Sequence, residues 1–60
     1  MIIFAKQAIP GNSYLSVPNR IPITVEKVEK SYVIISYLHR HYGLSKVQLP
    51  LTHLLKQEAR

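Results

Sequence analysis

Residues 21–40, IPITVEKVEKSYVIISYLHR, constrain the fold of this chain more than any other part of the sequence. The first half alternates apolar and polar residues and places Ile21, Ile23 and Val25 on one face, as in a strand with one buried side. The second half, residues 32–39, is apolar on both faces, which is typical of a central strand covered twice. Because a lone two-stranded ribbon is marginally stable in water, other segments must cover these strands.

The patterning predicts one mainly β domain over residues 1–60, a small antiparallel sheet or barrel-like fold with a short C-terminal helix. Strands are expected at residues 1–7, 13–17, 21–28, 32–39 and 46–50, and a helix at residues 51–59. In the third strand the pair Glu26 and Lys27 breaks the alternation, which predicts a β-bulge before Val28. The helix is predicted because Leu51, Leu54 and Leu55 fall at the helical spacing i, i+3, i+4, with Thr52 as the N-cap.

The small size of the chain and its lack of cysteine leave few ways to stabilise it. The chain has 60 residues and no cysteine, so disulfides and cysteine-based zinc sites are excluded. Small domains otherwise rely on a metal or on a partner chain. A second copy would also cover the outer face of residues 32–39. We therefore expect a homodimer.

The charge balance favours a polyanionic partner. Eight Lys and Arg residues stand against three acidic residues, a formal net charge of +5, which favours partners such as nucleic acid. Residues 39–46, HRHYGLSK, are expected to form a basic loop with Arg40, His41, Tyr42 and Lys46. In it, Arg40 and Lys46 would neutralise phosphates and Tyr42 would stack on an unpaired base. The alternative is a solvated loop whose charges only maintain solubility.

Other classes of function find little support. No nucleophile–base–acid set, phosphate loop or pair of carboxylates is visible, so we expect neither catalysis nor a cofactor. The three histidines, His39, His41 and His53, fall short of the four ligands of a structural zinc site, and no metal is expected. No segment reaches the ~18 apolar residues of a membrane span. The opening MIIFAKQ is too short and too little basic for a signal peptide, so a cytoplasmic location is expected.

Four stretches, in this order, carry a family resemblance: MIIFAKQ, IPITVEKV, SYVIISYLHR and VQLPLTHLLKQEA. Together they resemble the carbon storage regulator family of bacterial RNA-binding proteins. That family opens with Met, three aliphatic residues, a small residue and basic residues, and continues with a strand of the form I-x-I-T-V-x-x-V. The third stretch stands where the family has Q-V-R-I-G-I-N-A-P, and the fourth where it has V-A-V-H-R-E-E-I-Y-Q-R-I.

The resemblance implies an intertwined homodimer whose strands pair across the two chains. Family members bind GGA-containing loops of messenger-RNA leaders or small RNAs and modulate translation or messenger stability. By alignment, the RNA contacts would come from two segments of this chain. These are Phe4, Ala5, Lys6 and Gln7 in the first strand, and Val47, Gln48, Leu49, Pro50 and Leu51 at the last strand. Within the first segment, Phe4 is expected in the core and Lys6 at the RNA.

The chain departs from the family where RNA contacts matter most. The family's arginine after the last strand aligns with Leu51, and the histidine before it with Pro50. The second basic residue of the opening is Gln7, and the arginine of Q-V-R-I is Ile34. Three alternatives therefore stay open: a divergent relative that has lost GGA-type binding, a protein–protein interaction module, and a small basic DNA-binding β domain.

Overall fold

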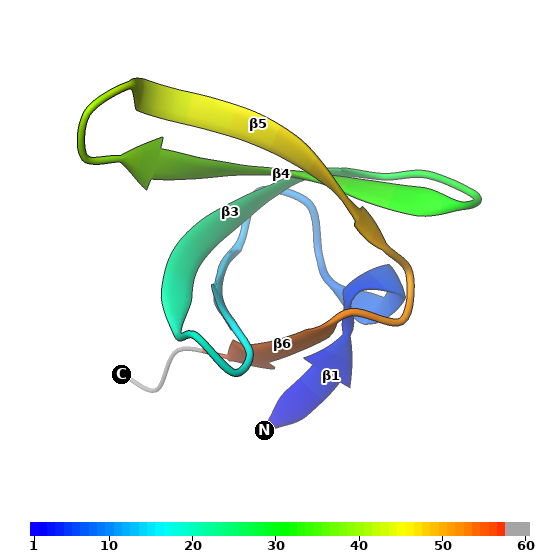
Figure 1. Ribbon diagram of the computed structural model, residues 1–60. Coiled ribbons are helices and arrows are strands. Elements are labelled where there is room, and N and C mark those ends of the chain that lie inside the picture. The colour runs from blue at the N-terminus through cyan, green and yellow to red at the C-terminus, as the bar shows by residue number, and fades with distance from the viewer. Residues whose placement is uncertain (58–60) are drawn as a thin grey trace.

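The computed structural model describes residues 1–57, and it is mainly β as predicted (Figure 1). Six antiparallel strands form one sheet in the order β1-β6-β2-β3-β4-β5. The strands are β1 (Ile2–Phe4), β2 (Ser13–Ser16), β3 (Ile21–Val28), β4 (Tyr32–His39), β5 (Gly43–Pro50) and β6 (Leu54–Gln57). The one helical element among the described residues is η1 (Ala5–Gln7), a single 3-10 turn.

β3 and β4 form the predicted pair, and both are interior strands of the sheet. The ladder runs from Thr24↔Ser36 to Val28↔Val33, and its register shifts between Val25 and Lys27. The shift is the predicted bulge, and it returns Val28 to the inner face after two consecutive polar residues.

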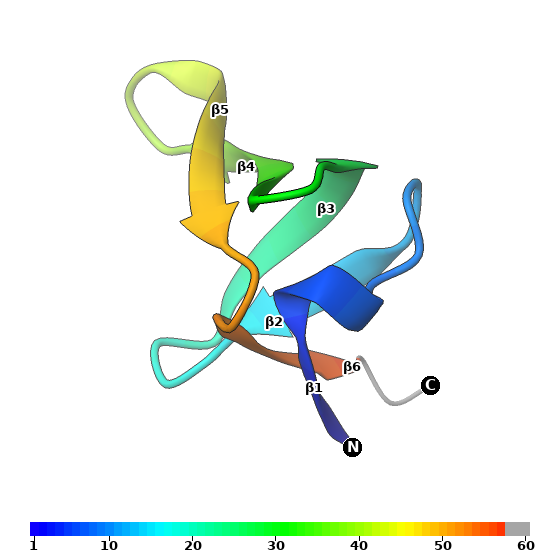
Figure 2. The ribbon, with the colours of Figure 1, turned by 90° about the vertical axis from the view of Figure 1, so that its right-hand side faces the viewer.

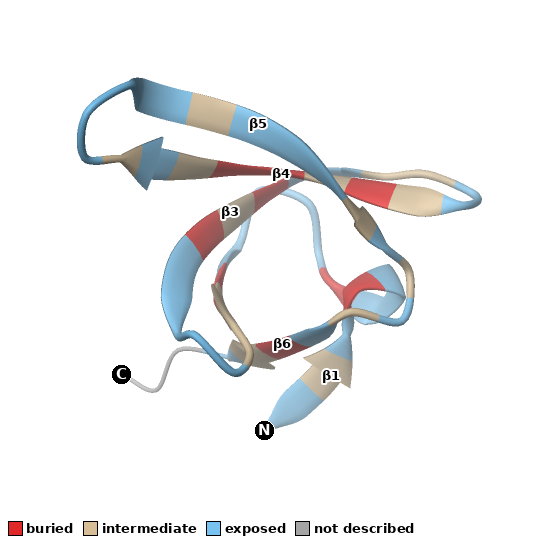
Figure 3. Cartoon of the chain, viewed as in Figure 1, coloured by how far each residue is buried: buried red, intermediate tan, exposed pale blue. Residues whose placement is uncertain are grey.

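The sheet curls around its own core. In Figures 1 and 2 the β4–β5 hairpin lies on one side of the molecule and the β1–β6 pair on the other, with β2 and β3 between them. Buried positions occur on β3, β4 and β6 (Figure 3). The side chains of Val25, Val33 and Leu55 are fully buried. They come from three different strands, so the curl brings the two ends of the sheet onto one core.

The first strand is shorter than residues 1–7, because the chain turns after Phe4 into η1. This turn closes one end of the curl: the backbone N–H of Ala5 donates to the His53 carbonyl (2.7 Å), and that of Lys6 donates to the Leu51 carbonyl (3.0 Å). Ala5 is completely buried there, whereas Phe4 keeps 42% of its surface exposed. The expectation that Phe4 lies in the core is therefore wrong, and Ala5 takes that place.

The predicted C-terminal helix is also wrong. Leu54–Gln57 is strand β6, which pairs with β1 on one side and β2 on the other. Leu54 is exposed and Leu55 buried, which is strand alternation. A helix of nine residues is marginal by itself, and ladders to two strands satisfy more of the backbone than one free helix. Residues 58 and 59 of the predicted helix lie outside the described residues.

The last predicted strand begins earlier than residue 46. β5 starts at Gly43 and pairs with the whole of β4, from His39↔Gly43 to Tyr32↔Pro50. The expected loop of residues 39–46 is therefore reduced to a turn at residues 40–42. Gly43 has a φ of +76°, a left-handed conformation that glycine adopts without a steric penalty.

The outer face of β4 is only partly covered by its own chain. Ile34 and Tyr32 are half-buried, and Ser36 is buried. Leu38, by contrast, is 79% exposed and lies opposite Leu44, which is 68% exposed. The uncovered apolar surface of β4 is thus confined to the end of the β4–β5 hairpin.

Candidate nucleic-acid interface

The tip of the β4–β5 hairpin gathers four of the chain's aromatic and basic residues. We call His39, Arg40, His41 and Tyr42 the hairpin tip. The backbone N–H of His41 donates to Nδ1 of His39 (3.1 Å), which ties the turn to the end of β4. Because Gly43 accepts a positive φ, the chain reverses within three residues and all four side chains stay together.

Three rings of the hairpin tip lie against one another. The ring centroids of His39 and Tyr42 are 4.7 Å apart, and those of His41 and Tyr42 are 6.4 Å apart with an edge-on geometry. Tyr42 is nevertheless 81% exposed. An exposed aromatic ring held in place by a neighbouring ring is a platform on which an unstacked base can lie.

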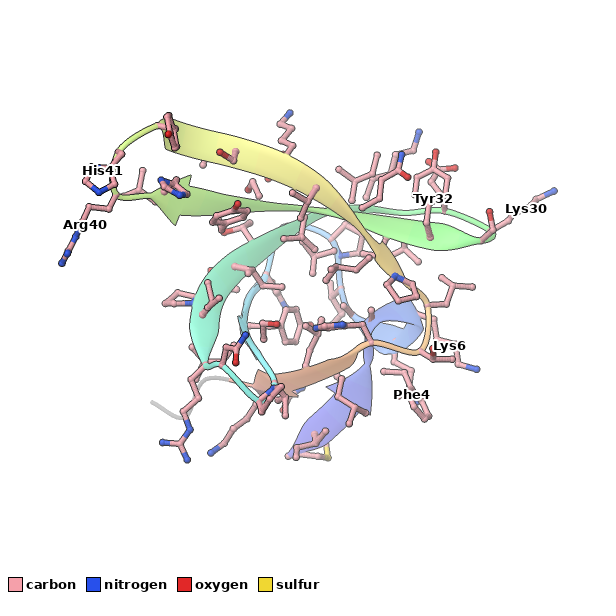
Figure 4. The ribbon with its side chains drawn as sticks, in the orientation of Figure 1. Phe4, Lys6, Lys30, Tyr32, Arg40 and His41 are labelled. Atoms are coloured by element: carbon pink, nitrogen blue, oxygen red, sulfur yellow. The ribbon has the colours of Figure 1, made fainter. Side chains whose placement is uncertain are left out.

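Arg40 and His41 extend from the end of the hairpin into solvent (Figure 4). The predicted fourth member of this group, Lys46, lies elsewhere. It stands opposite Ser36 on the outer face of β5, with its Nζ 3.9 Å from Oε1 of Glu26. The sequence placed Lys46 in the same loop, and the extension of β5 to Gly43 moves it away.

The two acidic residues among residues 1–57 both lie away from the hairpin tip. Glu26 accepts a hydrogen bond from the Ser36 hydroxyl (3.0 Å) on the outer face, beside Lys46. Glu29, at the β3–β4 turn, forms an ion pair with Lys27 (2.8 Å). The hydrogen bond and the charge of Glu29 raise the pKa of Lys27. Neither Glu26 nor Glu29 therefore neutralises the positive charge of the hairpin tip.

The first-strand residues that the family alignment selects form a separate corner around η1. Lys6 places its Nζ 5.6 Å from the centre of the Phe4 ring, a cation–π geometry. The side-chain carbonyl of Gln7 accepts a hydrogen bond from the Phe4 backbone N–H (2.9 Å). Ala5 is buried and has no surface for a ligand, so Phe4, Lys6 and Gln7 make up the exposed part.

The last-strand residues from the alignment divide between two faces of β5. Val47 and Leu49 lie opposite Ile35 and Val33 and face the core side, whereas Gln48 and Pro50 face outward. At the end of the strand, Leu51 contacts η1 through its backbone bond from Lys6 (3.0 Å). The two segments selected by the alignment therefore meet within one chain, at Leu51 and Lys6.

The predicted contacts thus form two groups rather than one surface. Figure 4 shows Arg40 and His41 at one end of the molecule, and Phe4 and Lys6 at the other. His39 belongs to the tip but was not among the predicted contacts. The signal that could have found it is its position two residues before His41, at the end of a strand.

Two other features bear on chemistry. The hydroxyl of Ser16 is 3.0 Å from Nε2 of His53, a contact that joins β2 to the β5–β6 connection. Neither described carboxylate is placed to orient this histidine, since Glu26 and Glu29 are paired on the opposite part of the sheet.

Within residues 1–57, no three His, Cys, Asp or Glu side chains are placed to hold a metal ion. No helix in this part of the chain is long and apolar enough to cross a membrane.

Comparisons with known proteins add no assignment. A scan against models of protein families, a search of curated proteins and a search of solved structures each gave no match.

Proposed function

We propose that the chain binds single-stranded RNA through the hairpin tip. The observation that carries this proposal is the exposed Tyr42 ring, supported by His39 and flanked by Arg40, at a place where the described chain has no carboxylate. Stacking on Tyr42 would hold an unpaired base, and Arg40 would neutralise an adjacent phosphate. The net charge of +5 adds attraction over a longer range.

The kind of RNA follows from the resemblance to the carbon storage regulator family. An RNA regulator of this type would bind hairpin loops in messenger leaders or small RNAs in the cytoplasm and change translation or messenger stability. Pro50 and Leu51 stand where the family has its basic residues, so we place the main contact at the hairpin tip rather than at the η1 corner.

Two copies of the chain would present two hairpin tips. β5 lies at an edge of the sheet and is hydrogen-bonded on one side only within residues 1–57. An eight-residue edge strand beside the exposed Leu38–Leu44 pair is suited to pairing with a second copy. A homodimer would cover this apolar end, and two linked sites would strengthen binding to RNAs with two loops.

A salt series against a short RNA hairpin tests the proposal. Affinity measured by filter binding should fall as salt rises, because phosphate neutralisation releases counterions.

Replacing Tyr42 with Ala should weaken binding by about 5- to 150-fold, the range expected for loss of one stacked base, whereas Tyr42→Phe should retain most of the affinity. Arg40→Gln should reduce the slope of the logarithm of the binding constant against the logarithm of the salt concentration by about 0.7, because one phosphate contact is lost.

Lys6→Gln is the matched control, because it removes one exposed charge at the opposite end of the molecule. A larger loss from Lys6→Gln than from Arg40→Gln would place the contact at the η1 corner. Undetectable binding at low salt would remove the proposal. Tighter binding to duplex DNA than to the RNA loop would favour the DNA-binding alternative.

A protein–protein interaction module is the second candidate, and the free edges favour it. β1 and β5 end the sheet, and each has one hydrogen-bonded neighbour in the described chain. Such edges can accept a strand from another protein. Binding to a defined partner protein, with no RNA affinity under the conditions above, would support this candidate over the first.

A further inference from the structure

A pocket of about 430 Å³ opens on the core side of the curled sheet. Four strands contribute to it, so it depends on the tertiary structure rather than on any local motif. The lining residues are Ser16, Ile21, Ile23, Ile35, Tyr37, His39, Val47 and Leu49. Its volume lies within the range of small-molecule sites, about 300–1,000 Å³.

The walls of the pocket are aliphatic. Five of its eight lining residues are Ile, Val or Leu. Ile23 and Ile35 form the buried part, and Val47 closes the side at the β5 edge with 37% of its surface exposed. Such walls favour an apolar body. A nucleobase would instead leave its polar edges against hydrocarbon without hydrogen-bond partners, which is costly.

Hydrogen-bond donors lie among these apolar walls. Tyr37 and His39 are neighbours on the inner face of β4, with ring centroids 6.3 Å apart. Because Nδ1 of His39 accepts the His41 backbone N–H, the neutral ring carries its proton on Nε2. Neither Nε2 of His39 nor the Tyr37 hydroxyl is hydrogen-bonded to another residue of the described chain. The Ser16 hydroxyl, the third polar group, is already paired with His53.

The charges near this polar end favour an anion. Arg40 follows His39 directly and is exposed. Both acidic residues within residues 1–57 are held by lysines elsewhere, Glu26 by Lys46 and Glu29 by Lys27. A ligand with a carboxylate at this end would meet two hydrogen-bond donors and no acidic side chain among the pocket's lining residues. The exposed Arg40, next in sequence to His39, would add attraction over a longer range.

We propose that this pocket binds a small amphipathic anion, a medium-chain carboxylate whose apolar body lies along Ile23, Ile35 and Val47. Its carboxylate accepts hydrogen bonds from Tyr37 and from Nε2 of His39. The proposal does not rest on RNA binding, because the ligand would lie on the core side of β4 and β5, although His39 contributes both to the pocket and to the support of Tyr42.

The test uses the full chain and three probes with the same hydrocarbon body: decanoate, decanol and decylammonium. Titration followed by the methyl signals of the isoleucines should show saturable binding of decanoate, with shifts at Ile23 and Ile35. Decanoate should bind roughly tenfold more tightly than decanol, as expected for hydrogen bonds to a charged group, and decylammonium more weakly still. Equal affinity for the three probes, or no saturation up to millimolar concentration, would overturn the proposal.

Two pairs of variants separate the pocket from unspecific adsorption. Val47→Phe fills the pocket and should lower decanoate affinity at least tenfold, whereas Gln48→Phe adds the same ring on the outer face and should not. Tyr37→Phe and His39→Gln should weaken decanoate binding more than decanol binding, because hydrogen bonds to the charged carboxylate are stronger than those to a hydroxyl. Equal effects of Val47→Phe and Gln48→Phe would contradict the assigned place. Isoleucine shifts with an RNA loop but not with decanoate would assign the pocket to a base instead.

Discussion

Leu55 anchors the β1–β6 end of the sheet in the common core, which also contains Val25 and Val33. It is completely buried in β6, where it lies opposite Ile3 of β1 on one side and Ser16 of β2 on the other. Leu55→Ala should therefore lower the free energy of unfolding by about 2–5 kcal/mol, measured by urea denaturation. A domain of this size has a total stability of only about 3–9 kcal/mol, so the variant should be partly unfolded in buffer.

Leu54→Ala is the matched control for that variant. Leu54 is the preceding residue of β6 and is exposed, so its truncation removes little buried surface and should change stability much less. Equal effects of the two substitutions would contradict the alternation assigned to β6 and would favour the helix that the sequence predicted.

Glu26, the bulge residue, accepts a hydrogen bond from the buried hydroxyl of Ser36. Ser36 is only 4% exposed and donates to Oε2 of Glu26 (3.0 Å). Glu26→Ala should cost about 1–3 kcal/mol, because it removes the acceptor of a buried polar group. Glu26→Gln retains an acceptor and should cost less, and Ser36→Ala should suppress most of the effect of Glu26→Ala in a double-mutant cycle. Additive effects of the two alanine substitutions would show that the bond contributes nothing.

At the scale of elements, the β4–β5 hairpin depends on the backbone of Gly43. Its φ of +76° is costly for other residues, although a Cβ at this position would meet no atom within 4 Å. Gly43→Ala should therefore destabilise the fold by about 1–2 kcal/mol through strain alone. Gly43→Asn should be milder, because Asn tolerates this region better. Thermal unfolding of both variants measures the loss of stability, and an unchanged melting temperature in Gly43→Ala would contradict the predicted strain.

The elements themselves were predictable to different degrees. Residues 13–16, 21–28 and 32–39 are strands as expected, because their period-two patterns coincide with the ladders that they form. The leucines at residues 51–55 fit a helix equally well as a local pattern. The long-range pairing of β6 with β1 and β2 overrides that periodicity, and no local signal reports it.

The candidate interface was predictable in the same uneven way. Arg40, His41 and Tyr42 are adjacent in sequence, so any short turn keeps them together. Lys46 was misplaced because β5 extends to Gly43. Tyr37 and His39 were missed as ligand contacts, since their role depends on the strands that lie across the pocket from them.

At the scale of the whole molecule, the open edge of β5 predicts the oligomeric state, which is measured as the molecular mass in solution. We expect the 6.9 kDa chain to form a dimer in light scattering at micromolar concentration. Leu44→Lys should shift the protein to the monomer, because it places a charge on the exposed apolar pair with Leu38. Thr52→Lys, an exposed position in the connection before β6, adds the same charge away from this edge and should leave the mass unchanged. A monomer at all concentrations would contradict the homodimer.

By itself, the sequence determined the β class, the β3–β4 pair with its bulge, and a basic segment with an aromatic residue inside it. These properties are local, because alternation and charge are written along a few consecutive residues. Only the tertiary structure decided that the last segment is a strand, that the hairpin tip and the η1 corner lie apart, and that a pocket opens between four strands. Those properties depend on hydrogen-bond partners and side chains that distant segments supply, and no short stretch of the chain contains them.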